Sequence, residues 1–175
     1  MKKLGIIGAM QVEVEILLGE MENRQERVIG GSTCHAGTLA GLDVVVVQCG
    51  VGKVNAAMCA QILCDCFGVT HLVNTGIAGS LNAELDIGDL VVSTDAMYHD
   101  FDCTHFGYPY GRVPGMDVTA FPADRLLSDL AFAAAEQNAA NGTIVTAPTC
   151  GSCGVLPAVL MYLQGKYHYS DLRMA

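Results

Sequence analysis

Basic residues are scarce in this chain. Its 175 residues include nine Lys and Arg against 18 Asp and Glu, which gives a net charge of −9 at pH 7. Because no Lys/Arg cluster is available to displace counterions from phosphates, the sequence excludes nucleic acid as a partner. Long apolar runs are missing too. No stretch approaches about 18 uninterrupted apolar residues, so the sequence excludes a membrane-spanning segment.

Signals for export and for disulfide bonding are also lacking. The apolar run of residues 4–8 is too short for the core of a signal peptide, and no small-residue cleavage site of the usual form follows it. The eight cysteines are scattered along the chain rather than arranged as a disulfide framework. We therefore expect a cytoplasmic protein whose thiols are reduced.

What the chain does contain is enough apolar material for one globular domain. Hydrophobic residues make up 51% of the sequence and charged residues 15%. Apolar patterning predicts strands that alternate with helices, and this alternation predicts an α/β fold with three layers. The expected strands, all of the buried type, are 4–8, 42–48, 70–75 and 87–94. The expected helices are 11–22, 53–67 and 124–140. We also expect a hairpin over 26–39 that turns at Gly30 and Gly31, and a loop over 98–118.

Two glycine-bearing turns follow expected strands. Residues 50–53 (Gly-Val-Gly-Lys) do not fit a phosphate-binding P-loop, which needs four residues between its glycines and a Ser or Thr after the lysine. A strand-to-helix turn, in which glycine permits close approach of the backbone, is the simpler interpretation. Residues 74–79 (Asn-Thr-Gly-Ile-Ala-Gly) form the second such turn.

Glu13 is a candidate catalytic carboxylate because it lies just beyond the strand that ends at Gly8. The carboxyl edge of a sheet is where α/β folds bind ligands. Spacing alone, however, favours a solvated helix glutamate, since several acids occupy the same helix.

Residues 98–110 hold the densest group of polar and aromatic side chains. His99, Asp100, Asp102 and His105 together suggest a metal cluster. Zinc sites seldom use so many oxygen ligands from one loop, and no Cys-x-x-Cys pair lies beside them. We expect no metal here.

These motifs, in this order and at these separations, resemble the first half of 5′-methylthioadenosine/S-adenosylhomocysteine nucleosidase, in the purine nucleoside phosphorylase-like superfamily. The matching segments are 5–10 (Gly-Ile-Ile-Gly-Ala-Met) with Glu13, 50–57, 74–79 and 98–110. The resemblance implies a three-layer α/β/α fold with a phosphorylase/hydrolase-like mixed sheet, truncated after its first half. It further implies a small-molecule nucleoside substrate, no cofactor and a homodimer.

The resemblance also assigns roles to single residues. Glu13 corresponds to the carboxylate that holds the attacking water. Phe106 and Pro114 would reach into the alkylthio pocket of the partner subunit. Ile77 stands where the family usually has Ser or Thr, so a side-chain hydrogen-bond donor is lost there. The substrate-binding positions that it implies are Met10, Val51, Ile77, Ala78 and Gly79.

The last part of the chain resembles a different family. Residues 143–160 (TIVTAPTCGSCGVLPAVL) and, before them, 133–139 are similar to a fragment of the α-domain of iron–sulfur L-serine dehydratase. We therefore predict a nucleosidase-like half-domain over 1–126 and a serine-dehydratase-like segment over 127–175 that is not an independent domain. Cys150 and Cys153 form a Cys-x-x-Cys pair, but two thiolates do not complete a tetrahedral site, and we interpret them as buried or idle thiols.

Cleavage of an N-glycosidic bond needs a carboxylate to activate water and an acid to protonate the departing base. The resemblance supplies Glu13 for the first role. It places the acid in the missing second half, and the match of Ser170-Asp171 to that family position is interpreted as coincidence. The first hypothesis is hydrolysis of methylthioadenosine or adenosylhomocysteine to adenine and a thioribose product, in nucleoside catabolism and methionine salvage. The alternatives are an inactive nucleoside-binding or dimerising chain and an L-serine dehydratase fragment.

Overall fold

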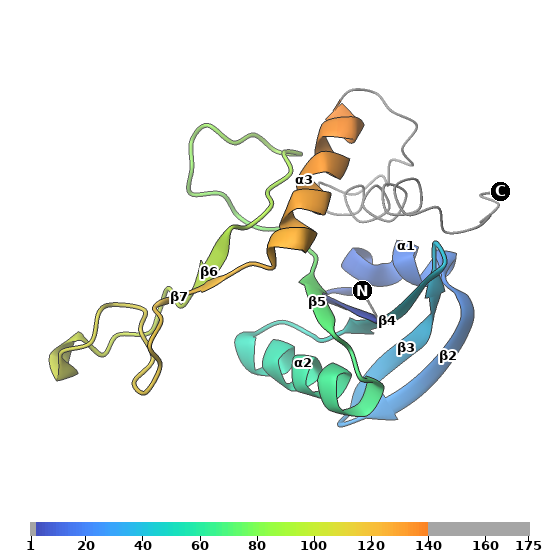
Figure 1. The fold of residues 1–175 in the computed structure, drawn as a ribbon, viewed down its shortest axis with the longest axis horizontal. Coiled ribbons are helices and arrows are strands. Elements are labelled where there is room, and N and C mark those ends of the chain that lie inside the picture. Colours follow the sequence, from blue (N-terminus) through green and yellow to red (C-terminus); the bar gives the residue numbers. More distant parts are fainter. Residues whose placement is uncertain (1–2, 140–175) are drawn as a thin grey trace.

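The computed structural model describes residues 3–139 of the chain. A five-stranded sheet and two helices form its main body, and a smaller two-stranded ribbon with a third helix follows (Figure 1). The elements are β1 (Leu4–Gly8), α1 (Gln11–Glu20), β2 (Glu22–Ile29), β3 (Ser32–Leu39), β4 (Leu42–Gln48), α2 (Lys53–Phe67), β5 (His71–Asn74), β6 (Asp95–Met97), the 3-10 turn η1 (Thr104–Phe106), β7 (Ala120–Pro122) and α3 (Arg125–Ala139).

The main sheet is mixed and has the strand order β2-β3-β4-β1-β5. Strand β1 runs parallel to both neighbours, with Ile6 opposite Val46 of β4 and Val73 of β5. Strands β2, β3 and β4 form an antiparallel meander, and Gly30 and Gly31 turn the predicted hairpin with positive φ angles of 58° and 82°. The carboxyl ends of β1, β4 and β5 consequently lie at one edge of the sheet.

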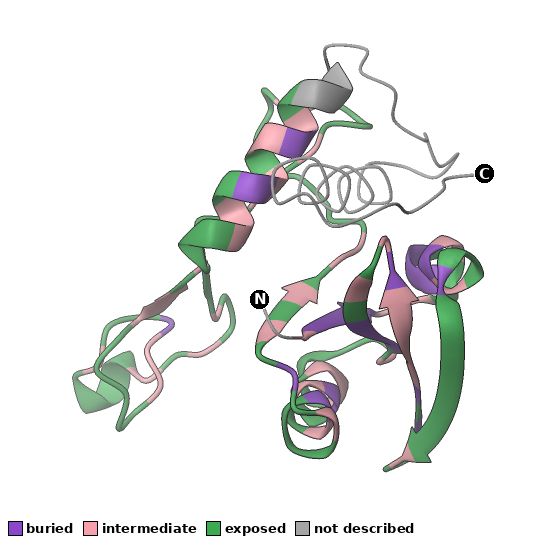
Figure 2. Cartoon of the chain, turned by 45° about the vertical axis from the view of Figure 1, so that its right-hand side comes forward, coloured by how far each residue is buried: buried purple, intermediate pink, exposed green. Residues whose placement is uncertain are grey.

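One helix covers each face of this sheet, which confirms the predicted three-layer arrangement. Val44 and Val46 belong to the core cluster that packs against α1, whereas Val45 and Val47 belong to the cluster against α2. This alternation follows from the period of two along a strand. It explains why residues 42–48 form an almost continuous apolar run, because both faces of β4 are buried (Figure 2).

Several predicted elements are confirmed with their boundaries. Strands 4–8 and 42–48 and helix 53–67 agree with the structure residue for residue. The first helix ends at Glu20, because Met21 is extended and the chain turns directly into β2. The third helix begins at Arg125 and continues without a break across the predicted junction at 126/127, so that domain boundary stays a prediction.

Two predictions about strands are wrong. Residues 87–94 form no strand, and the short β6 begins only at Asp95; Ile87 is 97% exposed. Strand β5, expected to be buried, lies at the edge of the sheet, and Leu72 is 39% exposed. An apolar run becomes a buried strand only if a neighbour covers it, and among residues 3–139 no strand pairs with the outer edge of β5.

The β6–β7 ribbon carries the loop of residues 98–119 and lies to one side of the main sheet (Figures 1 and 2). Gly111 fixes this loop: its φ is +81°, and a Cβ placed there would come within 2.8 Å of the Tyr98 carbonyl oxygen. Only glycine fits that position. No helix in the described part of the chain is long and apolar enough to cross a membrane.

Candidate active site

Three turns meet at the carboxyl edge of the sheet. They follow β1, β4 and β5, which run parallel, and hydrogen bonds continue the sheet into them. The Cys49 N–H donates to the Gly8 carbonyl at 2.9 Å, and the Thr75 N–H donates to the Ile7 carbonyl at 2.9 Å. The arrangement is the one in which open α/β sheets place ligands.

Glu13 lies where these turns come together, and its residue is only 5% exposed. Its Oε2 accepts hydrogen bonds from the Ala9 N–H at 2.7 Å and from the Met10 N–H at 2.8 Å. Its Oε1 accepts from the Ile77 N–H at 3.0 Å. The side chain therefore joins the turn after β1 to the turn after β5, 64 residues further along the chain.

Two glycines make room for this carboxylate. A Cβ at Gly76 would stand 2.5 Å from Oε1 of Glu13 and 2.9 Å from its Cδ. A Cβ at Gly8 would stand 2.6 Å from Cγ1 of Val14 and 3.2 Å from Cβ of Glu13. Real Cβ atoms do not approach other atoms so closely, so both turns need glycine to let the backbone approach the side chain.

The interpretation of Glu13 as a solvated helix residue is therefore wrong. A carboxylate offers about four acceptor positions on its two oxygens, and backbone N–H groups occupy three of them. The remaining position is on Oε1, which accepts a single protein hydrogen bond. Glu13 also lies in the first turn of α1, where the helix dipole favours a negative charge. The site can thus hold one polar hydrogen, such as that of a water molecule, against a fixed carboxylate.

The residues expected to bind substrate lie around this carboxylate to different degrees. Met10 and Ile77 contact it through their backbone N–H groups. Val51 is 75% exposed in the turn after β4, where its carbonyl accepts a hydrogen bond of 2.8 Å from Nδ2 of Asn55. Ala78 and Gly79 continue the turn after Ile77 and are exposed. Their binding roles remain predictions.

Phe106 and Pro114 lie away from this edge, in the loop between β6 and β7. Phe106 ends η1 and is 76% exposed, and Pro114 is also exposed. The loop stands apart from the main sheet in both views (Figures 1 and 2). Neither side chain forms part of the Glu13 site of its own chain in this arrangement.

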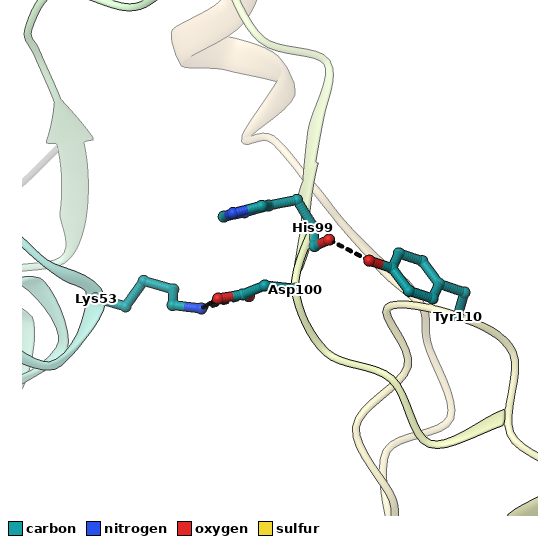
Figure 3. A network of polar contacts seen from close by, with 4 residues as sticks. All are labelled: Lys53, His99, Asp100 and Tyr110. Atoms are coloured by element: carbon teal, nitrogen blue, oxygen red, sulfur yellow. Dashed lines mark hydrogen bonds and ion pairs between the residues drawn. The ribbon is translucent and has the colours of Figure 1, made fainter. Parts of the chain in front are cut away.

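The acidic residues of the same loop have hydrogen-bond partners within the protein. Both oxygens of Asp100 accept from Lys53 Nζ, and this hydrogen bond lowers the pKa of the Asp100 carboxyl below its usual range (Figure 3). Asp102 accepts from the hydroxyl and the N–H of Thr104 at 2.6 and 2.9 Å, and these bonds lower its pKa as well. Within residues 3–139, no three His, Cys, Asp or Glu side chains are placed together so that they could hold a metal ion.

Sequence reasoning missed three parts of the site. The N–H of Ile77 anchors the carboxylate, whereas the resemblance concerns only the side chain at this position. Gly76 leaves space for that carboxylate, and its place between the expected strand 70–75 and Ile77 was the available signal. No local pattern indicates the pairing of Lys53 with Asp100. Cys150, Cys153 and Asp171 lie outside the described residues.

Comparison with known proteins agrees with this geometry. The sequence profile described as the phosphorylase superfamily matches residues 3–157, beyond the end of the predicted half-domain at 126. A 5′-methylthioadenosine/S-adenosylhomocysteine nucleosidase of Chromohalobacter salexigens is 45% identical over 128 residues, which are 73% of this chain and 54% of that protein. The chain thus spans about half the length of this curated relative.

Solved structures are similar over comparable lengths. The nucleosidase of Neisseria meningitidis in complex with methylthio-immucillin-A is 39% identical, with a TM-score of 0.75 over 79% of this chain and 59% of that one. The nucleosidase of Colwellia psychrerythraea in complex with adenine is 36% identical, with a TM-score of 0.76 over 95% of this chain and 78% of that one. The chain therefore belongs to the phosphorylase superfamily and, within it, to the family of 5′-methylthioadenosine/S-adenosylhomocysteine nucleosidases.

Proposed function

We propose that this protein hydrolyses the N-glycosidic bond of 5′-methylthioadenosine or S-adenosylhomocysteine, releasing adenine and the thioribose product. The observation that carries the proposal is the buried Glu13 carboxylate, fixed by N–H groups from two turns at the carboxyl edge of the sheet. Family membership supplies the substrate class. The roles in nucleoside catabolism and methionine salvage follow from the products.

Glu13 acts on the water side of the reaction. Its free acceptor position on Oε1 orients a water molecule and takes a proton from it as the water attacks the sugar. Because the three N–H donors hold the carboxylate in place, little reorganisation is needed when the bond breaks. The exposed turns that carry Val51 and Ile77 then form the wall on which the nucleoside lies.

The departing purine needs a proton from the other side. Among residues 3–139, Glu13 has only backbone N–H groups as hydrogen-bond partners, so this carboxylate shares no hydrogen bond with a second acid. The resemblance to the family places the acid that protonates the purine in the second half of the nucleosidase sequence. Losing an acid–base partner costs about 10²–10⁴ in rate.

We place two copies of the chain in a homodimer. Helix α2 supports this assignment, because Val54, Ala57 and Met58 are exposed on one of its faces, and Val54 is 81% exposed. Residues separated by three and four positions form one stripe on a helix. In the dimer, Phe106 and Pro114 close the alkylthio end of the partner's pocket.

The cytoplasm is the compartment that fits these side chains. Six cysteines lie in the described part of the chain, and all six are free thiols. Reduced thiols are the usual state in a reducing compartment.

A coupled adenine-release assay with methylthioadenosine tests the activity, using the wild type, Glu13→Gln and Glu15→Gln. Glu15 is the matched control, since it is an exposed acid on the same helix. We expect activity in the wild type and in Glu15→Gln, and a loss of at least about 10²-fold in Glu13→Gln. Activity that survives in Glu13→Gln removes Glu13 from the mechanism.

Calorimetric titration with adenine and methylthioadenosine separates the remaining outcomes. Binding without turnover in the wild type would identify an inactive nucleoside-binding chain. Pyruvate formed from serine by the same preparation would favour the serine dehydratase alternative instead.

A further inference from the structure

Two motifs have no part in the chemistry described above: Lys53 of the Gly-Val-Gly-Lys turn and the acidic loop around Asp100. The structure joins them. We propose that Lys53 is a positioning residue that tethers the loop of residues 98–111 to the start of α2 and so sets the place of Phe106. This inference rests on the proposed function, in which Phe106 closes the partner's pocket.

The tether is formed by one side chain with two contacts. Lys53 Nζ lies 2.5 Å from Oδ1 and 2.6 Å from Oδ2 of Asp100. The same ammonium lies 5.3 Å from the centre of the Tyr98 ring, a distance typical of a cation–π contact. Figure 3 shows the lysine extending from α2 toward the loop. Charge attraction and ring contact thus act on the same short segment of the loop.

The loop behind Asp100 is closed upon itself. The Tyr110 hydroxyl donates to the His99 carbonyl at 2.5 Å (Figure 3). The Gly111 N–H donates to the Phe101 carbonyl at 2.8 Å. Within the closed loop, the N–H of Phe106 donates to the Cys103 carbonyl at 2.9 Å. Because these hydrogen bonds join the loop into one compact unit, a contact that holds Asp100 in place also holds Phe106.

Few other polar contacts hold this unit to the main body. Among residues 3–139, Lys53–Asp100 is the single ion pair between the segment 95–122 and the residues before it. Strands β6 and β7 pair with each other and with no strand of the main sheet. Lys53 also follows directly on Val51 and Gly52, in the turn proposed to line the chain's own pocket. The tether therefore connects that turn to the loop that serves the partner.

Both partners are about half exposed, at 56% for Lys53 and 49% for Asp100. An exposed ion pair shifts an equilibrium by about fivefold at most. We therefore expect removal of the tether to loosen the loop and to leave the fold and the chemical step intact. The effect should appear in the binding of the alkylthio group, which Phe106 contacts.

The kinetic test uses Lys53→Met, which keeps most of the stem and removes the charge, together with Asp100→Asn and the double variant. Lys53→Arg serves as the conservative rescue. Arg125→Met breaks an exposed ion pair elsewhere and is the matched control. We expect KM for methylthioadenosine to rise about twofold to fivefold in Lys53→Met and Asp100→Asn, with kcat nearly unchanged. KM for adenosine, which lacks the alkylthio group, should not change, and the double variant should be no worse than either single variant.

Hydrogen exchange at the amides of Phe106 and Gly111 gives a readout that does not depend on activity. We expect faster exchange at both amides in Lys53→Met and Asp100→Asn, and wild-type exchange in Lys53→Arg and Arg125→Met. Unchanged exchange overturns the proposal whatever the kinetics show, and so does an equal rise in KM for both nucleosides. If the wild type releases no adenine, the proposed function fails, and the exchange data still decide whether Lys53 holds the loop.

Discussion

Replacing Glu13 by Gln should destabilise the protein, apart from the effect on catalysis proposed above. A carboxylate accepts at both oxygens, whereas an amide has one accepting oxygen and one donating NH₂ group. If the amide oxygen takes the place of Oε2, it keeps the bonds from Ala9 and Met10. The NH₂ group then faces the N–H of Ile77, and two donors meet. The opposite orientation is worse, because the NH₂ group would face two N–H groups.

The size of the effect follows from these three bonds. A hydrogen bond to a charged group contributes about 1.5–3 kcal/mol and a neutral one about 0.5–1.5 kcal/mol. Loss of the Ile77 bond costs about 2 kcal/mol, and the change from charged to neutral acceptor costs about 1 kcal/mol for each of the other two. We therefore expect Glu13→Gln to lower the free energy of unfolding by about 3–4 kcal/mol, a large part of the 5–15 kcal/mol typical of a domain.

Urea denaturation followed by circular dichroism measures this difference, with Glu15→Gln as the control. The control should stay within about 0.5 kcal/mol of the wild type, as expected for an exposed side chain. Amide exchange at Ile77 should be faster in Glu13→Gln than in the control. A loss below about 1 kcal/mol would refute the reasoning, because it would mean that the three N–H groups do not depend on a charged acceptor.

Three further predictions concern the space beside the carboxylate, the loop and the thiols. Gly76→Ala should lower the free energy of unfolding by about 1–3 kcal/mol, because its Cβ would stand 2.5 Å from the carboxylate. Gly79→Ala should leave it unchanged, since no atom lies within 4 Å of a Cβ there. Equal losses in the two variants would contradict this packing. The pKa of Asp100 is lowered in the folded loop, so its bond to Lys53 stabilises the loop at pH values above about 3.9, the pKa of an unfolded Asp carboxyl. This stabilisation is lost as the pH falls through the pKa that Asp100 has in the folded protein. Carboxyl NMR titration should show this pKa rising in Lys53→Met, and no rise would exclude the bond in solution. Burial raises the pKa of the Cys34 thiol, so iodoacetamide at pH 8 should alkylate exposed Cys64 first, and peptide mapping that found Cys34 modified first would contradict its burial.

The sequence predicts best those elements whose apolar pattern alone indicates burial. Strand β4 carries the continuous apolar run Val44–Val47 because helices cover both of its faces, so this run alone predicts a buried strand. Residues 87–94 carry a similar apolar run, yet they form no strand, since pairing depends on a neighbour that hydropathy does not show. Whether a strand lies at the edge or in the centre depends on the whole sheet, and this is why β5 was wrongly expected to be buried.

For a related reason, the place of Glu13 at the carboxyl edge of the sheet could be predicted, whereas its hydrogen-bond partners could not. Glu13 could be found from its distance to Gly8, but the N–H that anchors its second oxygen comes from Ile77, 64 residues away. Lys53 and Asp100 are separated by 47 residues, and Lys53 begins α2 whereas Asp100 lies in a loop, so no helical or strand periodicity connects them. Contacts of this kind become visible only when the fold brings the turns together.

Ile77 shows how binding and chemistry can depend on different atoms of one residue. By the resemblance to the nucleosidase family, its side chain stands where Ser or Thr is usual. The side chain is 61% exposed, so any loss of a side-chain donor affects the exposed side of the turn. Its N–H is independent of side-chain identity and fixes the carboxylate on the other side. The substitution therefore leaves the proposed water-activating carboxylate in place and changes only the exposed side of the turn, where we propose that the nucleoside binds. Under the proposed function, such a chain keeps a well-positioned base while its substrate preference or its affinity shifts. Calorimetric titration and the adenine-release assay therefore measure separate properties of one turn.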